Sequence, residues 1–384
     1  MDFTFTEEQQ MLRETVRKFT EKDVKPLARQ IDTEKKIPEE LLDTCREMGL
    51  FGILIPEEYG GIGAGDTGYC IVTEEIARGS SSLAVYLGAH QSIGAMAIIL
   101  DGTEEQKKRF LPAMATGEKV GAFALTEPNA GSDASSLEST AERRGDHFVV
   151  NGTKIWITNG NVADVISLFV GTPRKEGQKG GVTALIVEST MPGFKVGAVD
   201  DKMGIRGASS SELIFEDMIV PAETLLGREG KGFATAMKTL DHGRLGIAAM
   251  CIGVAKEALR LSVEHAKGRI QFGRPIAELQ AIQWMIAEIA AETYAMESMA
   301  YRTAWMADRG DRVTREGAIA KMFTSECLDR IVDKALQIHG GMGYMRDYPI
   351  EMFYRDSRIN RIFEGTNEIQ RLIIARDVLK RGGY

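Results

Sequence analysis

The sequence predicts a mainly α-helical protein with a β domain in the middle of the chain. Apolar residues recur at helical spacing before about residue 118 and again after about residue 230. Between these limits, short runs of β-branched and aromatic residues alternate with Gly, Pro and Ser, which is typical of strands and turns. We therefore expect an N-terminal helical domain at 1–118, a middle β domain at 119–229 and a C-terminal four-helix bundle at 230–384.

The N-terminal domain is predicted to begin with a helix that starts after Thr6, a residue type that caps helices. Val16 and Phe19 follow near helical spacing. The segments IPEELLDTCREMGL, TGYCIVTEEIARG and SIGAMAIILDG continue the amphipathic pattern. Glycine commonly ends helices, and the predicted helix ends are Gly49, Gly79 and Gly102.

The middle domain is predicted from its strands. HFVVNGTKIWIT (147–158) carries Asn151-Gly152 between β-branched and aromatic residues, a pair that favours a β-hairpin turn. GVTALIVES, GFKVGAV and SELIFEDMIV follow as further strands, separated by Gly, Pro and Ser. We therefore expect a hairpin whose turn is at Asn151-Gly152.

The C-terminal domain is predicted to consist of four long helices. The segment that begins with Pro275, expected in a first-turn position, runs for about thirty residues without a break. The segments 233–268 and 315–341 have the same character, and a fourth helix follows Thr366. Helices of this length are typical of a bundle.

Composition argues against several classes of protein. The net charge of −8 argues against nucleic-acid binding, for which a basic surface is expected. The cysteines form no CxxC pair and the histidines show no HExxH spacing, so we predict neither a disulfide framework nor a metal site. These cysteines are Cys45, Cys70, Cys251 and Cys327.

The N-terminal segment and the apolar stretches bear on location. MDFTFTEEQQMLRET has neither the apolar core of a secretory signal nor the Arg-rich character of a mitochondrial presequence. The longest apolar stretch, 245–255, is too short to cross a bilayer. We therefore expect a cytoplasmic protein without a membrane span.

Glu364, in IFEGTNEIQR (362–371), is a candidate catalytic base. It follows the apolar residues Ile362 and Phe363. A carboxylate beside apolar neighbours loses hydration, which raises its pKa and makes it a stronger base. The alternative is that Glu364 merely precedes a helix capped by Asn367, with Gln370 three residues later.

Three other segments could bind a ligand. The turn in FALTEPNAGSD (123–133) offers successive backbone N–H groups to anionic or carbonyl oxygens, although an ordinary β-loop is the better explanation of this motif taken alone. In KIWIT, Trp156 and Thr158 share one strand face and suit an aromatic ring system, unless Trp156 only fills a sheet core. In RIQFGRPI, Arg269 and Arg274 offer donors to phosphate, and Gly273 allows a close backbone approach.

Three further motifs lie at a helix end, on a helix face and in a glycine-rich segment. The glycines of QIHGGMGY (337–344) exceed what a helix end needs. In DHGR, Asp241 and Arg244 lie on one helix face, for which a surface ion pair is the simple explanation. GGIGAG (60–65) lacks the GxGxxG spacing, so we predict a loop there and no dinucleotide-binding Rossmann fold.

Together and in this order, ALTEPNAGSD, NGTKIWITNG, LDHGR, QFGRPI, QIHGGMGY and IFEGTNEIQR resemble the motifs of the acyl-CoA dehydrogenases over essentially the whole chain. The resemblance is closest to the short-chain (butyryl-CoA) and medium-chain members. It implies the acyl-CoA dehydrogenase fold, one FAD per subunit, a homotetramer (a dimer of dimers) and electron transfer to electron-transfer flavoprotein. The implied reaction, a step of fatty acid β-oxidation, converts an acyl-CoA to the trans-2-enoyl-CoA.

The resemblance also implies roles for individual residues. Glu364 would remove the α-proton while the β-hydrogen leaves as hydride to flavin N5, near Thr158. The implied FAD contacts are Phe123, Ala124, Leu125, Thr126, Gly131, Ser132, Trp156, Ile157, Thr158, Arg269, Phe272, Gln280, Gln337, Ile338, His339, Gly340, Gly341, Thr366, Asn367 and Glu368. The implied acyl-CoA contacts are Ser132, Asp241, His242, Gly243, Arg244 and Gly365. The FAD phosphate and adenine contacts would reach across a subunit interface.

Several alternatives remain open at this point. Some branched-chain members of the family carry their base on the DHGR helix. Here that position is Gly243, which has no side chain that could act as a base. An acyl-CoA oxidase would use oxygen as acceptor, and a non-catalytic scaffold or DNA-binding protein would hold no flavin. No Lys or Arg lies between Arg78 and Lys107, which disfavours a glutaryl-type substrate, whereas branched and cyclic acyl groups stay possible.

Overall fold

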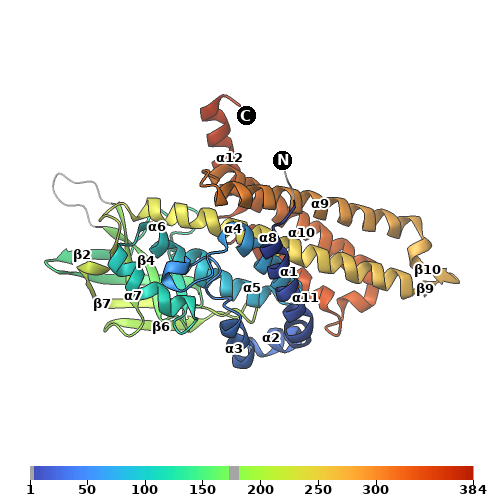
Figure 1. Ribbon diagram of the computed structural model, residues 1–384, viewed down its shortest axis with the longest axis horizontal. Coiled ribbons are helices and arrows are strands. Elements are labelled where there is room, and N and C mark those ends of the chain that lie inside the picture. The colour runs from blue at the N-terminus through green and yellow to red at the C-terminus, as the bar shows by residue number, and fades with distance from the viewer. Residues whose placement is uncertain (1–3, 173–180, 384) are drawn as a thin grey trace.

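A computed structural model describes residues 4–172 and 181–383 (Figure 1). The sheet of the middle domain lies at one end of an elongated molecule, and the long helix α8 runs from it toward the opposite end, where α9 and α10 lie beside it. The N-terminal helices pack along one side of these long helices and reach the sheet. The three-part fold, helical with a middle sheet domain, confirms the predicted fold class.

The N-terminal part begins with α1 (Glu7–Phe19), whose first turn is closed by reciprocal hydrogen bonds between Thr6 and Gln9, as a capping box requires. The remaining helical segments up to residue 115 are π-helix Thr20–Val24, 3₁₀ turn Lys25–Leu27, α2 (Ala28–Glu34), α3 (Glu39–Glu47), 3₁₀ turn Glu57–Tyr59, α4 (Gly65–Ala77), α5 (Ser81–Gly88), π-helix Ala89–Ala95, α6 (Met96–Asp101) and α7 (Glu104–Ala115). Helix α4 is buried almost throughout, against α8 and α9.

One helical run deserves comparison with a membrane helix. Ser81–Asp101, which spans α5 to α6, is long and apolar enough to cross a bilayer, and 78% of its most apolar window is buried inside the protein. This run is longer than the apolar stretch 245–255 that was considered from the sequence. Its apolar surface is used in packing against the rest of the fold, including α8.

The middle domain is an eight-stranded sheet within the described residues. Its strands follow the order β6-β7-β3-β2-β4-β5-β8, and β1 pairs in parallel with β4. Their bounds are β1 (Gly121–Ala124), β2 (Thr140–Arg144), β3 (His147–Thr158), β4 (Val165–Thr172), β5 (Gly181–Glu188), β6 (Phe194–Val199), β7 (Ser210–Pro221) and β8 (Leu225–Leu226).

The predicted hairpin turn at Asn151-Gly152 is wrong. Both residues lie inside the continuous strand β3, where the register with β7 shifts between Val150 and Gly152. A Cβ at Gly152 would lie 2.7 Å from Cα of Ser139, so glycine permits the close approach of the chain next to it. The Asn-Gly pair therefore marks a β-bulge, which can require the same residue types as a turn.

The C-terminal part is built on three long helices, α8 (Gly232–Gly268), α9 (Gln280–Asp308) and α10 (Thr314–His339), of which α9 runs antiparallel to the other two. The prediction that Pro275 lies in the first turn of the helix is wrong. Pro275 lies in a two-strand turn formed by β9 (Ile270–Gln271) and β10 (Arg274–Pro275), before α9 begins. After α10 come the 3₁₀ turn Gly340–Tyr344, α11 (Pro349–Ser357), the 3₁₀ turn Arg358–Arg361 and α12 (Asn367–Arg381). Helix α12 packs on α10 at its start and then projects from the body (Figure 1).

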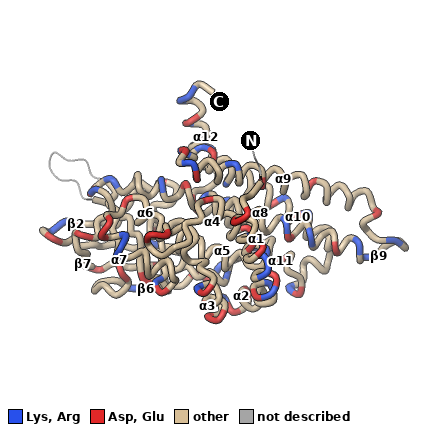
Figure 2. Tube along the Cα trace, in the orientation of Figure 1, with Lys and Arg blue, Asp and Glu red and all other residues tan. Residues whose placement is uncertain are grey.

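Charged residues of both signs are interspersed along the described chain (Figure 2). One group of charged side chains, built around buried acids of α4, links the N-terminal helices to the bundle. Glu74 of α4, fully buried, accepts hydrogen bonds from Tyr301 at 2.7 Å and Lys256 at 2.8 Å. Its neighbour Glu75 accepts from Arg17 of α1. These contacts fix α1 and α4 against α8 and α9, and so fix one wall of the cavity described next.

Candidate active site

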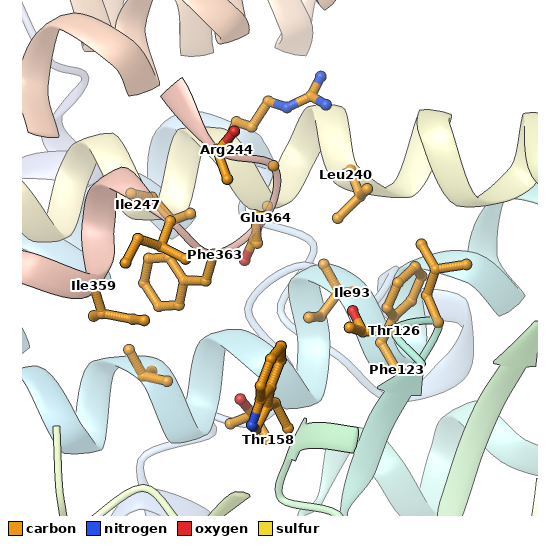
Figure 3. Close-up of a pocket in the computed structure, with 18 of the residues that line it drawn as sticks. Ile93, Phe123, Thr126, Thr158, Leu240, Arg244, Ile247, Ile359, Phe363 and Glu364 are labelled. Atoms are coloured by element: carbon orange, nitrogen blue, oxygen red, sulfur yellow. The ribbon is translucent and has the colours of Figure 1, made fainter. Parts of the chain in front are cut away.

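A cavity of about 1280 Å³ lies where the three parts of the chain meet. One wall comes from α4, α5 and the π-helix Ala89–Ala95, and a second from α8. The ends of strands β1 and β3 and the loop 200–208 form the third wall. The turn between residues 362 and 366 forms the fourth. Figure 3 shows Glu364 projecting from that turn toward Ile93 and Thr158.

Glu364 lies in a tight turn before α12. Its backbone φ of 53° and that of Gly365, 91°, are both in the left-handed region, which a glutamate seldom adopts. The side chain is directed into the cavity, where its buried Oε2 has no hydrogen-bond partner among the described residues. Burial raises the pKa of Glu364 to about 7, although Arg244 and Lys321 favour the ionised form.

Gly243 of α8 leaves the space that the carboxylate of Glu364 occupies. A Cβ at this position would overlap Oε2 of Glu364 and lie 2.9 Å from its Cδ. It would also lie 2.9 Å from Cγ2 of Ile93. The missing side chain of Gly243 is therefore a requirement of the site.

The neighbours of Gly243 point in different directions. Arg244 is buried and lines the cavity, and its Nη1 donates to Asp241 Oδ1 at 2.6 Å. This ion pair is therefore buried at Arg244, and it is not the simple surface ion pair considered from the sequence. Asp241 itself does not line the cavity and also accepts from Thr314 at 2.6 Å. His242 pairs with Asp66 at 2.8 Å, outside the cavity, so this placement gives no support to its expected acyl-CoA contact.

The sheet contributes a group of predicted residues to the cavity. Trp156 has a φ of 57° at an irregular point of β3 and is 65% exposed, so it does not fill the sheet core. Ala124 is buried in the sheet core and does not line the cavity. The predicted residues that do line it are Phe123, Leu125, Thr126, Gly131, Ser132, Trp156, Ile157 and Thr158.

A buried ion pair fixes the loop that these residues share. Lys154 of β3 donates to Glu127 at 2.6 Å and to the carbonyl of Leu125 at 2.9 Å. Glu127 also accepts from the backbone N–H of Glu138 at 2.5 Å and from the hydroxyl of Ser139. Removing either partner would leave the other charge buried, so the loop is held firmly against β3.

The start of α12 differs from its prediction. The helix is capped by Thr366, whose side chain accepts from the N–H of Ile369, and not by Asn367. Asn367 is buried against α10, where it contacts Lys321 and Ser325. Thr366 and Gly365 line the cavity, whereas Asn367 and Glu368 do not.

A second, smaller pocket of about 350 Å³ lies at the opposite end of α8. It brings together predicted residues from two segments, Arg269, Ile338, His339, Gly340 and Gly341. His265 was not predicted, and its ring stacks on that of His339 with centroids 4.4 Å apart. Phe272, Gln280 and Gln337 do not line this pocket, and Phe272 is 91% exposed at the tip of the β9–β10 turn.

Several cavity residues were not predicted from the sequence. Leu240 and Ile247 lie on the same α8 face as Gly243 and Arg244, so extending the DHGR motif by helical spacing would have found them. Tyr69 and Ile93 come from other segments, and no short motif marks them.

Comparison with known proteins places this fold in a family. The chain matches the acyl-CoA dehydrogenase N-terminal domain over residues 6–118, the middle domain over 122–218 and the C-terminal domain over 230–379. It is 47% identical to an acryloyl-CoA reductase (NADH) of Anaerotignum propionicum, covering 99% of this chain and 97% of the relative. It is 43% identical to a short-chain specific acyl-CoA dehydrogenase of Clostridium acetobutylicum, covering 99% and 100%.

Solved structures agree with this result. Butyryl-CoA dehydrogenase from Megasphaera elsdenii superposes with a TM-score of 0.95 at 40% identity, covering 99% of this chain and 100% of that one. An acyl-CoA dehydrogenase complexed with FAD from Bacillus anthracis gives 0.92 at 40%, covering 98% and 68%. A chain from work on the electron transferring flavoprotein of Acidaminococcus fermentans gives 0.96 at 42%, covering 99% and 100%.

The chain therefore belongs to the acyl-CoA dehydrogenase family, a family of flavin-dependent oxidoreductases. Its activity is that of an acyl-CoA dehydrogenase, which confirms the class of enzyme that the motifs predicted.

Proposed function

We propose that this protein uses FAD to convert a short- or medium-chain acyl-CoA to the trans-2-enoyl-CoA, with Glu364 as the base that removes the α-proton. The observation that carries the proposal is the buried Oε2 of Glu364, which faces the cavity without a hydrogen-bond partner among the described residues. A carboxylate with this freedom can accept a proton from a bound substrate. Its pKa of about 7 matches a base that works near neutral pH.

The residues of the cavity fit a flavin. Trp156 exposes a flat aromatic face to it, and Thr126 and Thr158 offer hydroxyl groups to the polar edge of a ring system. The turn 131–132 adds backbone N–H groups. A flavin held by these residues would supply the acceptor for the β-hydrogen of the substrate as hydride, chemistry that no side chain can perform.

The chain's own residues then prepare the proton transfer. Ile93, Ile247 and Phe363 surround Glu364 with apolar surface, which excludes water and keeps the carboxylate basic. The left-handed turn at Glu364 and Gly365 fixes the direction of the side chain. Arg244 keeps positive charge near the carboxylate, which limits the rise of its pKa.

The test is an anaerobic mixture of the flavin-loaded protein with butyryl-CoA. We expect the yellow flavin absorbance to bleach as the flavin is reduced. A colourless purified protein, or a yellow one that no acyl-CoA bleaches, would contradict the proposed reaction. A second assay uses oxygen with no other acceptor. Stoichiometric release of peroxide would favour an acyl-CoA oxidase, which uses oxygen, over a dehydrogenase that uses electron-transfer flavoprotein.

We also propose that two copies of the chain complete each FAD site within a homotetramer. The residues implied for FAD are divided between the main cavity and the pocket at the far end of α8. Gly243 and His265 are 22 residues apart on α8, about 33 Å at 1.5 Å per residue, and this separation supports a second copy as the source of the far pocket. Exposed aromatic side chains on α9, which a second copy could cover, support this arrangement: Trp284, Tyr294 and Trp305.

The electron partner and the direction of reaction have support from the relatives. The similar chain from work on an electron transferring flavoprotein supports such a protein as the partner. The 47% identical acryloyl-CoA reductase favours a second candidate function, the reduction of an enoyl-CoA with electrons that enter through the same flavin. The test compares two rates. If acryloyl-CoA reoxidises the reduced protein faster than butyryl-CoA reduces the oxidised protein, the reductase is favoured.

Tyr69 is expected to limit the length of the acyl chain. A Cβ at Gly246 would overlap its hydroxyl and lie 2.8 Å from its Cζ, so the phenol fills the gap between α4 and α8. Gly246 lies about 4.5 Å along α8 from Gly243, and therefore one turn from the base. Tyr69→Ala should raise kcat/KM for octanoyl-CoA relative to butyryl-CoA by at least about tenfold, since each buried methylene contributes ~0.8 kcal/mol.

Tyr69→Phe is the matched control for chain length, because it keeps the ring. We expect the ratio of kcat/KM for the two substrates to stay at the wild-type value in this variant. An unchanged ratio in Tyr69→Ala with normal flavin content would show that another residue ends the acyl site.

A further inference from the structure

The turn that carries Glu364 is held from α10. Lys321 Nζ donates to the carbonyl of Gly365 at 2.7 Å and to Asn367 Oδ1 at 3.0 Å. Gln370 Nε2 donates to the carbonyls of Gly365 at 2.9 Å and Glu364 at 3.2 Å. These contacts satisfy the two carbonyls of a backbone that is strained at Glu364, and so keep the side chain directed into the cavity.

Lys321 is an unusual choice for this structural task. Its side chain is fully buried, and both hydrogen bonds go to neutral oxygens. Burial lowers the pKa of Lys321 to about 8, while the nearby Glu364 favours its charged form. A buried ammonium group without an acid in direct contact is costly, and an uncharged donor could make the same hydrogen bonds. The charge itself therefore calls for an explanation.

The groups that face Glu364 supply that explanation. Arg244 approaches from α8, Lys321 from α10, and the phenol of Tyr69 from α4. Arg244 also favours the ionised form of Glu364, and its own charge is partly matched by Asp241 at 2.6 Å. The remaining groups near Lys321 are the exposed Glu368 and the thiol of Cys251. Lys321 thus leaves a positive charge free to act on Glu364.

We propose that Lys321 is a positioning residue for the base: it fixes the strained turn through the carbonyl of Gly365 and adds a positive charge, beside that of Arg244, that favours the ionised form of Glu364. The inference rests on the proposed role of Glu364. It predicts that Lys321 acts on two separable properties, the geometry of the turn and the protonation of the carboxyl group.

Three variants of the flavin-loaded protein separate these properties. Lys321→Gln keeps a hydrogen-bond donor without charge, Lys321→Met keeps neither, and Lys321→Arg keeps both. The protonation of Glu364 is followed by its carboxyl band in infrared difference spectra over pH, assigned by its absence in Glu364→Gln. The acid limb of the pH profile of kcat/KM is measured in parallel.

We expect the pH midpoint of the protonation of Glu364 to rise by about one unit in Lys321→Gln and Lys321→Met. In Lys321→Arg this midpoint should stay near the wild-type value. Lys321→Met should in addition lower kcat at high pH, where Glu364 is ionised in every variant. Lys334 is the control for loss of a lysine from α10: it pairs with Glu288 of α9 at 2.9 Å, and Lys334→Gln should leave both readouts unchanged.

Three results would overturn the inference. An unchanged midpoint in Lys321→Gln and Lys321→Met, with normal flavin content, would remove the electrostatic role. An equal rise in Lys321→Arg, or failure of all three variants to fold, would leave Lys321 a purely structural residue. The infrared midpoint does not depend on turnover, so these outcomes stay distinct from bleaching by Glu364→Gln, which would instead contradict the proposed base.

Discussion

Glu364→Gln should bind flavin with wild-type stoichiometry and bleach with butyryl-CoA roughly 10²–10⁴-fold more slowly than the wild type, the range typical of a lost general base. Glutamine has nearly the same shape as glutamate, so the cavity keeps its form while the group can no longer accept a proton. The measurement is the rate of anaerobic flavin reduction in rapid mixing, at a saturating concentration of acyl-CoA.

Two further measurements make this result specific. Glu40→Gln removes an exposed acid from α3 by the same substitution and should bleach at the wild-type rate. Binding of butyryl-CoA, followed as a perturbation of the flavin spectrum, should persist in Glu364→Gln. Rapid and complete bleaching by Glu364→Gln would exclude Glu364 as the base.

Gly243→Ala should lower kcat by about a hundredfold, since a misplacement of roughly 1 Å at a catalytic group can have that effect. The new methyl group would overlap Oε2 of Glu364 and press on Ile93, so the carboxylate must turn away from its position. Stability should not fall in parallel, because alanine favours a helix interior over glycine by about 1 kcal/mol. Thermal unfolding and steady-state kinetics of the same preparation test both statements.

Gly268→Ala is the matched control on the same helix. A Cβ at Gly268 meets nothing within 4 Å, so this variant should keep wild-type kinetics. Wild-type kcat in Gly243→Ala would mean that the carboxylate has room to move and still reach the substrate, which contradicts the tight placement described here.

The order of helices and strands could be predicted because apolar spacing reports directly on which face of an element is buried. The errors arose where one residue type serves two backbone geometries. Asn151-Gly152 suits a turn, but neighbouring strands on both sides make it a bulge in β3. Pro275 suits a first helical turn, but here it lies in a short β-turn before the helix. Local preference does not distinguish these cases, whereas tertiary pairing does.

The candidate site was predictable to the extent that its residues lie in motifs. Glu364, Trp156 and Arg244 were identified in this way, and the structure brings them to one cavity. Lys321 and Tyr69 carry no local signal, because their importance comes from contacts with segments far away in the chain. His242 illustrates the reverse case: it lies inside a motif, yet its side chain pairs with Asp66 outside the cavity.

The distance between the two pockets along α8 has a genetic consequence under the proposed two-copy arrangement. Damage at Arg269 would then empty the neighbouring protomer's flavin site and leave the damaged chain's own Glu364 intact. Two inactive alleles, one altered at Glu364 and one at Arg269, could therefore restore part of each other's activity when expressed together. Two alleles altered at the same end of the molecule could not.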